Sequence, residues 1–158
     1  MRSAGTVVAV CVSERKGTPK SEVGAVRLLE DHGIEGDAHA GTKERQVSLL
    51  CEQSAQKLKD AGIELRPGIF AENIRVSGLG IGDFAVGTTV RLERGPVLEV
   101  SQIGKECHGK GCAIARLVGR CVMPTEGIFA RVIRGGEVRA GDSVEVERHD
   151  EGRRACDK

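Results

Sequence analysis

The stretch Val86-Gly-Thr-Thr-Val-Arg-Leu-Glu-Arg-Gly-Pro-Val-Leu-Glu-Val-Ser-Gln-Ile103 holds two short apolar runs with a turn between them. Residues 86–92 and 97–103 are rich in valine, leucine, isoleucine and threonine, residues that suit a β-strand. Arg94-Gly95-Pro96 separates the runs, and glycine and proline are typical of turns. The stretch therefore predicts a β-hairpin.

Further strands are expected on both sides of this hairpin. Apolar and β-branched residues dominate five other segments, at 6–12, 23–29, 69–76, 128–133 and 143–147, and a shorter apolar segment covers 46–50. Glycine is unusually frequent, with 22 residues, about double its usual share. Glycines at such short intervals leave room for strands and little room for long helices.

Two Gly-Asp pairs precede strands in the same way. Gly82-Asp83 comes before the strand at 86–92, and Gly141-Asp142 comes before the alternating segment 143–147. We expect each pair to form a turn in which the aspartate bonds to its own downstream backbone. A helix is expected at 52–61, with Gly62 as its stop, and one or two helical turns at 111–118.

These elements predict a mainly β protein with a few short helices. Many short strands joined by glycine turns favour a closed or partly open β-barrel, because closure removes exposed strand edges. The length matches a single domain, expected at residues 1–150. The charged segment 151–158 is expected to be a disordered tail.

Composition excludes several classes of function. The net charge is +1 and the only aromatic residues are three phenylalanines, so neither phosphate attraction nor base stacking favours nucleic-acid binding. The N-terminus has no signal-peptide pattern, and no apolar run is long enough to span a bilayer. We therefore expect a cytoplasmic protein without a membrane partner, whose six cysteines stay reduced.

The segment Ser101-Gln-Ile-Gly-Lys-Glu-Cys-His-Gly-Lys-Gly-Cys112 is the first candidate for chemistry. Cys107 follows a predicted strand end, and Lys105, His108 and Lys110 would favour its thiolate, the form that attacks sulfur or binds a soft metal. Glu106 would instead raise the pKa of the Cys107 thiol, or pair with a lysine. The alternative is a structural cysteine in a glycine-rich loop.

A zinc site is a second interpretation of the same segment. Its ligands would be Cys107, His108, Cys112 and Cys121. The spacing lacks the paired knuckles of structural zinc sites, and two adjacent ligands would strain to reach one ion.

Polar residues in two other segments are further candidates. The loop Gly33-Ile-Glu-Gly-Asp-Ala-His-Ala-Gly41 offers His39 as a proton shuttle or ligand, against the alternative that Asp37 only forms a turn and His39 is its solvated neighbour. Lys43 and Arg45 could hold an anionic group, or form surface ion pairs. Glu72-Asn73, inside the strand expected at 69–76, is either bonded internally or faces a cavity.

Three of these segments, in order and at these separations, resemble the MOSC domain, known from molybdenum cofactor sulfurases and from stand-alone bacterial proteins. Gly33–His39 resembles its Gly-Asp-x-His loop, and Gly68–Ile74 resembles its Gly-x-Phe-Gly-Glu-Asn strand. Ser101-Gln102 with Cys107 matches the family's reactive cysteine after a Ser-Gln strand end. The resemblance covers roughly Gly5 to Glu147.

This resemblance implies a β-barrel and a cysteine that acts in molybdenum cofactor chemistry. Cys107 would carry sulfur as a persulfide or ligate molybdenum, with His39 in the family's histidine position. The family's Pro-Arg-x-Pro-Cys is here Ile-Gly-Lys-Glu-Cys107, which lacks the arginine, whereas Cys112 and Cys121 favour a thiol relay.

The sequence thus predicts a domain for sulfur transfer or for handling molybdopterin. Cys107 is the acceptor nucleophile or the metal ligand, Cys112 resolves the persulfide, and His108 and His39 assist. The expected cofactor-binding residues are Lys105, Lys110, Arg45, Glu72 and Asn73. No pyridoxal phosphate is expected on this chain, so a cysteine desulfurase would supply sulfur, and cofactor biosynthesis proteins or molybdoenzymes would accept it. The alternatives are a molybdenum-dependent reductase of N-hydroxylated compounds and a zinc-stabilised interaction module.

Overall fold

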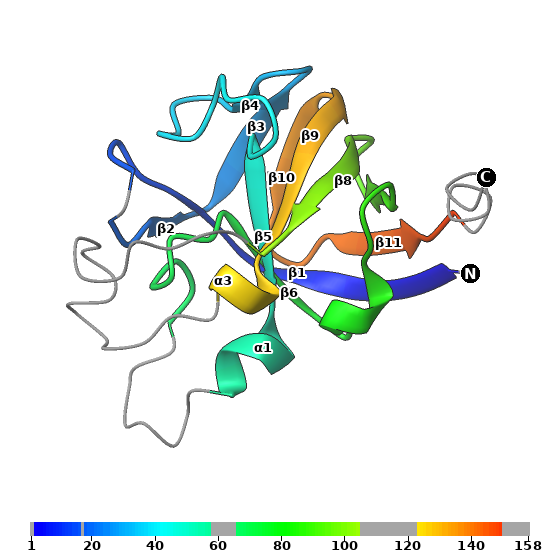
Figure 1. Ribbon diagram of the computed structural model, residues 1–158. Helices are drawn as coiled ribbons and strands as arrows, with labels where there is room; N and C mark the ends of the chain where they lie inside the picture. The colour runs from blue at the N-terminus through cyan, green and yellow to red at the C-terminus, as the bar shows by residue number, and fades with distance from the viewer. Residues whose placement is uncertain (1, 17, 58–65, 105–122, 150–158) are drawn as a thin grey trace.

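The short apolar segments become strands of two sheets in the computed structural model (Figure 1). The structure describes residues 2–16, 18–57, 66–104 and 123–149. Its strands are β1 (Arg2–Val12), β2 (Ser21–Val23), β3 (Ala25–Leu29), β4 (Gly33–Ile34), β5 (Val47–Cys51), β6 (Ile74–Ser77), β7 (Thr89–Leu92), β8 (Val97–Ile103), β9 (Ile128–Arg134), β10 (Gly136–Arg139) and β11 (Ser143–Glu147). The helical elements are α1 (Glu52–Gln56), the 3-10 helix η2 (Ile81–Asp83) and α3 (Met123–Glu126).

Seven strands close into a barrel, in the order β11-β7-β8-β9-β5-β6-β1, with β11 pairing back onto β1. Strand β2 extends the sheet beyond β1. A separate three-stranded sheet has the order β10-β3-β4. The predicted closed barrel and mainly β class are therefore confirmed.

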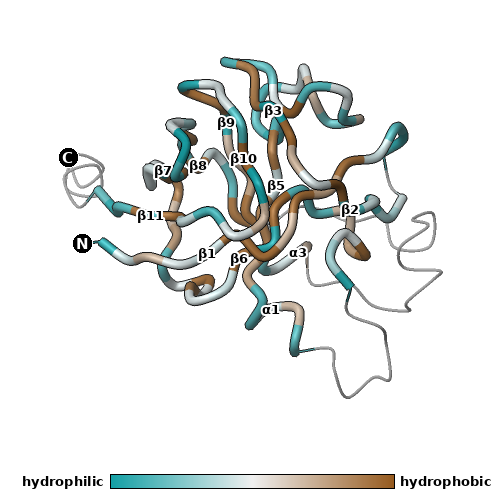
Figure 2. Tube along the Cα trace, turned by 180° about the vertical axis from the view of Figure 1, so that it is seen from behind, coloured by the Kyte–Doolittle hydropathy of each residue, from teal (hydrophilic) through white to brown (hydrophobic). Residues whose placement is uncertain are grey.

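The barrel interior is filled by alternate residues of its strands. On β7, β8 and β11 the inward positions are buried, and they carry Val90, Leu92, Leu98, Val100, Val144 and Val146. In Figure 2 the hydrophobic, brown segments run along the strands in the middle of the molecule, whereas the loops are largely hydrophilic. This alternation is the sequence signal that located the strands.

Several predicted elements are confirmed. The hairpin forms as β7 and β8, which pair antiparallel, and the segment 143–147 is β11. Helix α1 begins at Glu52 as expected, but it ends at Gln56, earlier than the predicted end at residue 61. The helical turns expected at 111–118 and the tail expected at 151–158 lie outside the described residues. None of the described helices has the length and apolarity that a membrane crossing requires.

Three predictions about local structure are wrong. The single strand expected at 23–29 changes sheet at Gly24, because β2 pairs with β1 whereas β3 pairs with β10. The strand expected at 69–76 begins only at Ile74, since the residues before it form a turn. No strand was predicted between residues 133 and 143, where β10 begins at Gly136.

The two Gly-Asp pairs form turns of the same kind, but the aspartate does not make the hydrogen bond that was expected. Asp83 accepts the backbone N–H of Gly80 at 2.8 Å, and Asp142 accepts that of Arg139 at 2.9 Å. Each carboxylate therefore bonds three residues upstream rather than downstream, and closes the turn that precedes its strand.

Candidate functional site

The loop at residues 33–41 folds around the carboxylate of Asp37. It turns at Gly36, whose φ of +84° is accessible to glycine at little cost. Asp37 Oδ1 accepts the backbone N–H of Ser13 at 3.1 Å, and Oδ2 accepts that of His39 at 3.0 Å. Asp37 is therefore more than a turn former, because it ties the loop to the end of β1 and orients His39.

Lys20 lies behind this loop with a fully buried side chain (0% exposed). Its Nζ is 2.8 Å from Asp37 Oδ1, 3.0 Å from Ser13 Oγ and 3.1 Å from His39 Nδ1. A buried ammonium needs such partners, because leaving its charge unpaired is costly. We call Lys20, Asp37 and His39 the cavity cluster. Sequence analysis missed Lys20, since nothing in the polar stretch 13–20 distinguishes it from Lys16.

Asp37 is held in its charged form. Burial alone would raise the pKa of its carboxyl, but the contacts with His39 and Lys20 outweigh burial and hold that pKa well below the ordinary 3.8. Its negative charge therefore balances Lys20 at neutral pH. The side chain of His39 is 20% exposed, so His39 is the member of the cluster that reaches solvent.

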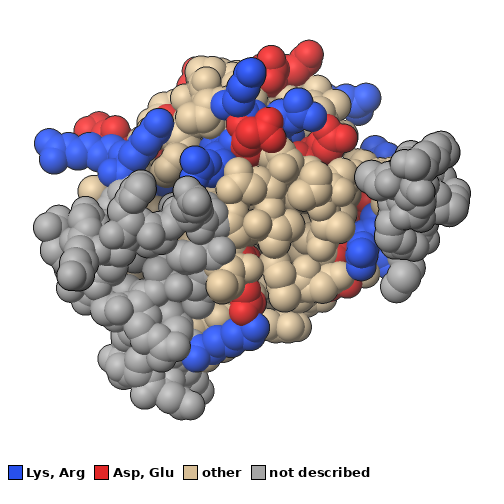
Figure 3. Space-filling model, in the orientation of Figure 1, with Lys and Arg blue, Asp and Glu red and all other residues tan. Residues whose placement is uncertain are grey.

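The side chain of His39 lines a basic cavity of about 340 Å³. The cavity is lined by Lys16, His39, Thr42, Lys43, Glu44, Arg45 and Gln102. Three cations face one carboxylate there, and Arg45 lies 5.9 Å from the centre of the Phe129 ring. Figure 3 shows charged side chains of both signs gathered on the upper part of the molecule, where the loop before β5 lies in Figure 1. The cationic excess at the cavity favours an anionic ligand.

The end of β8 forms another wall of this cavity through Gln102. Ser101 Oγ donates to the carbonyl oxygens of Glu44 and, at 3.2 Å, of Phe129. Gln102 Nε2 donates to Gly104 O at 2.7 Å. Ser101 therefore joins the cavity loop to β9, six positions before Cys107. The candidates Lys105, Cys107, His108, Lys110, Cys112 and Cys121 themselves lie outside the described residues.

Glu72 sits in a turn rather than in a strand, with a buried carboxylate. Its oxygens accept the backbone N–H groups of Gly68 at 2.8 Å and Phe70 at 3.1 Å. Arg75 Nη2 lies 2.6 Å from Glu72 Oε2, and Arg75 Nη1 lies 3.0 Å from Glu52 Oε1. Burial alone would lower the pKa of Arg75, but the two carboxylates outweigh it and raise that pKa. We call Glu52, Glu72 and Arg75 the crossover cluster.

Asn73 joins strands that are distant in the sequence. Its Nδ2 donates to Cys11 O on β1 at 3.0 Å, and its Oδ1 accepts the N–H of Ser48 on β5 at 3.0 Å. Glu72 and Asn73 are both fully buried and bonded inside the protein, and neither lines the basic cavity. Their bonds describe a structural role; that they bind a cofactor stays a prediction.

Gly68 connects the two clusters. It accepts the backbone N–H of Lys20 at 2.7 Å and donates its own N–H to Glu72. Its φ is +88°, and a Cβ there would lie 2.2 Å from Lys20 O. The first glycine of the stretch 68–74 is therefore required by close contact with the backbone of Lys20.

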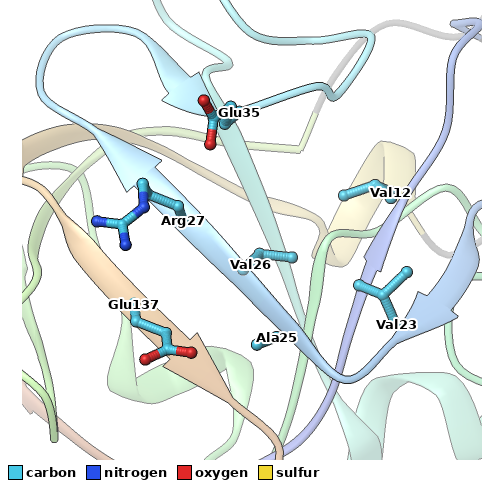
Figure 4. A pocket seen from close by; sticks show the side chains of 7 residues that line it. All are labelled: Val12, Val23, Ala25, Val26, Arg27, Glu35 and Glu137. Carbon is cyan, nitrogen blue, oxygen red and sulfur yellow. The ribbon is translucent and has the colours of Figure 1, made fainter.

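A second hollow, of about 350 Å³, lies between β1, β2 and the small sheet (Figure 4). Val12, Val23 and Val26 contribute apolar surface, and Arg27, Glu35 and Glu137 line its other side. It lacks the cationic excess of the basic cavity and contains none of the predicted site residues.

The two described cysteines, Cys11 and Cys51, are buried. Burial raises the pKa of each thiol to about 12, so neither ionises near neutral pH and neither competes as a nucleophile. Among the described residues, no group of three or more histidines, cysteines or carboxylates is arranged to hold a metal ion. The ligands of the zinc interpretation lie outside those residues.

The barrel thus has a basic cavity, lined by His39 and by Gln102 near the end of β8. The family model of the MOSC domain matches residues 36–145. The chain therefore belongs to the MOSC domain family, which is associated with molybdenum cofactor-related functions.

Solved structures share the fold. The YUAD protein from Bacillus subtilis is 19% identical, with a TM-score of 0.77 over 94% of this chain and 98% of that chain. YiiM from Geobacillus stearothermophilus is 19% identical, with a TM-score of 0.69 over 91% of this chain and 75% of that chain. YiiM from Escherichia coli is also 19% identical, with a TM-score of 0.63 over 94% of this chain and 71% of that chain. No curated protein matches the sequence.

Proposed function

We propose that this protein carries sulfur for molybdenum cofactor chemistry, with Cys107 as the sulfur acceptor and the basic cavity as the seat of an anionic cofactor group. The supporting observation is the cavity itself. It gathers Lys16, Lys43 and Arg45 beside His39, and Gln102 in its wall precedes Cys107 by five positions in the sequence.

The chain connectivity keeps Cys107 close to this cavity. Gly104 is the last described residue of the segment, and Cys107 follows it by three positions. Since an extended chain advances about 3.5 Å per residue, the Cα of Cys107 is within about 11 Å of the Cα of Gly104. This limit is compatible with a thiol that reaches a ligand bound beside Gln102.

The residues present suit the molybdenum cofactor, whose pterin carries a phosphate. A cavity of about 340 Å³ lies in the range of roughly 300–1,000 Å³ that small-molecule sites occupy. Arg45 and the two lysines would bind the phosphate, and Thr42 and Gln102 supply further polar groups. When bound, the cofactor supplies the metal centre that receives sulfur. Buried Glu72 and Asn73 would hold the shape of the site from behind Gly68.

The sulfur step is a thiol exchange and needs no external oxidant. The Cys107 thiolate attacks the outer sulfur of a persulfide on a cysteine desulfurase. A new S–S bond forms on Cys107, the S–S bond of the donor breaks, and the donor leaves as a thiolate. Cys112 can then attack the Cys107 sulfur, which releases hydrosulfide and leaves a disulfide that a cellular dithiol reduces. The reducing cytoplasm suits this cycle, and a cofactor biosynthesis protein or a molybdoenzyme would accept the sulfur.

Intact-mass spectrometry after incubation with a cysteine desulfurase and cysteine tests the sulfur step. We expect the added sulfur on the wild type and none on Cys107→Ser. Cys156→Ser is the matched control, since it removes a thiol from the expected tail and should still take up sulfur. Equal sulfur uptake by the wild type and Cys107→Ser would contradict the proposal.

A second experiment tests the cavity. Protein purified from molybdenum-replete cells is assayed for bound molybdenum and pterin. We expect Arg45→Gln to retain about tenfold less than the wild type, which corresponds to about 1.4 kcal/mol. Arg91→Gln removes one exposed charge from β7 and should retain as much as the wild type. Equal loss of pterin from both variants would show that retention depends on net charge alone, and would contradict a specific role of Arg45.

A further inference from the structure

The contact between Lys20 and His39 determines which ring nitrogen of His39 carries the proton. Lys20 Nζ lies 3.1 Å from His39 Nδ1 and 2.8 Å from Asp37 Oδ1. The carboxylate keeps Lys20 an ammonium, which can donate and cannot accept. A ring nitrogen that receives this hydrogen bond must therefore offer a lone pair.

The neighbouring carboxylate does not reverse this assignment. His39 Nδ1 is 3.8 Å from Asp37 Oδ2, which is too long for a hydrogen bond. Asp37 Oδ2 instead accepts the backbone N–H of His39 at 3.0 Å. In a neutral imidazole with Nδ1 as the acceptor, the proton lies on Nε2.

We propose that the buried Lys20–Asp37 pair fixes His39 as the Nε2–H tautomer, so that His39 presents a hydrogen-bond donor to the basic cavity. Lys20 is thus a positioning residue, which touches no ligand and acts through His39. The side chain that meets the ligand donates, as do Lys16, Lys43 and Arg45 around it.

The tautomer defines the class of ligand group. A cavity wall whose cationic N–H donors outnumber its one carboxylate, that of Glu44, favours a negatively charged acceptor, such as a phosphate or an oxyanion, over an amine. The tautomer follows from the described geometry alone, whereas the role of Nε2–H toward a bound cofactor rests on the proposed function. A neutral His39 that already carries its proton on Nε2 offers a hydrogen bond to the ligand and has no lone pair on that nitrogen with which to remove a proton.

Long-range ¹H–¹⁵N spectra of the ¹⁵N-labelled wild type measure the tautomer directly. His39 is assigned by its loss in His39→Gln, and His32, which is exposed near the same loop, is the internal control. We expect one protonated nitrogen, Nε2, at His39 from neutral to mildly alkaline pH, and a mixture of tautomers at His32. A His39 ring that is protonated on Nδ1, or on both nitrogens, in the wild type overturns the proposal.

Variants of Lys20 test whether the ammonium is the cause. Lys20→Arg keeps a charged donor and should keep the Nε2–H tautomer. In Lys20→Met the donor is lost, and we expect a substantial Nδ1–H population that turns toward Asp37. If Lys20→Met does not fold, Lys20→Met/Asp37→Leu removes the buried charge as well, and a mixture of tautomers is expected there. An unchanged single Nε2–H tautomer in whichever of these Met variants folds overturns the role of Lys20.

A titration with inorganic phosphate tests the donor role independently of sulfur transfer. We expect a phosphate-dependent shift of the His39 Nε2 resonance and none at His32. The absence of that shift overturns the donor role. Failure of Cys107 to take up sulfur, with the tautomer and the phosphate shift intact, contradicts only the proposed function.

Discussion

The cavity cluster and the crossover cluster are both buried ion pairs, yet they use their polar atoms differently. In the crossover cluster, the carboxylate oxygens of Glu72 accept hydrogen bonds from Arg75 and from the N–H groups of its own turn. In the cavity cluster, His39 remains partly exposed and extends the network to a basic cavity. Both clusters have one partly exposed member, but only His39 lines a cavity, whereas the side chain of Glu52, 33% exposed, lines neither of the two cavities described.

The largest effect is expected from breaking the crossover cluster. Arg75→Met leaves the Glu72 carboxylate buried without its partner, and we expect the free energy of unfolding to fall by about 3–5 kcal/mol. Glu72→Gln/Arg75→Met should regain part of that loss, because no unpaired charge remains. Urea denaturation measures both. A double variant less stable than the sum of the single losses would contradict the assignment of a coupled pair.

The next effect tests the link between the clusters. Gly68→Ala places a Cβ 2.2 Å from Lys20 O at a positive φ, and overpacking and backbone strain together should cost about 2–4 kcal/mol. We also expect a changed His39 ring spectrum, because the backbone of Lys20 must move. Gly82→Ala, where an added Cβ meets nothing within 4 Å, is the matched control. If Gly68→Ala is destabilised but its His39 spectrum is unaltered, Gly68 does not link the cavity cluster to the crossover cluster.

Asp37→Asn weakens the cavity cluster and changes its response to acid. The loss of a charged partner for Lys20 should cost about 1.5–3 kcal/mol at neutral pH. The folded-state pKa of Asp37 is lowered from 3.8, so its contribution is present above about pH 3.8 and is lost as the pH falls further. Urea midpoints across that range should therefore decline more steeply for the wild type than for Asp37→Asn. Parallel declines of the two midpoints would show that the pKa of Asp37 is not lowered in the folded protein.

The smallest effect is expected at Ala71, in the turn before β6. Ala71 has a φ of +66°, where the similar family pattern Gly-x-Phe-Gly-Glu-Asn has glycine. Relief of the left-handed strain exceeds the entropic cost of glycine, so Ala71→Gly should stabilise the protein by about 0.5–1 kcal/mol. Thermal unfolding measures this gain, and destabilisation would indicate that the methyl group packs usefully.

The sequence predicted those parts of the fold where one face of a strand is buried. Val144 and Val146 alternate with polar residues, so β11 was located to the residue. The prediction of a strand at 69–76 failed because the turn before Ile74 is held by long-range bonds, of Gly68 with Lys20 and of Asn73 with Cys11, which no local pattern records. In the candidate site, His39 and Arg45 were identified, but Lys20 was not, because its burial arises only when residues 13 and 37 meet.

The ring of seven strands has a consequence that its hydrogen bonds alone do not reveal. An odd number of neighbours on a circle cannot alternate up and down throughout, so one adjacent pair must run the same way. Here that pair is β5 and β6, and every other neighbour in the ring is antiparallel. Parallel neighbours need a long connection, and residues 52–73 provide it. Parity therefore requires one long connection in this barrel, and here the segment that contains Gly68 and Glu72 is part of it.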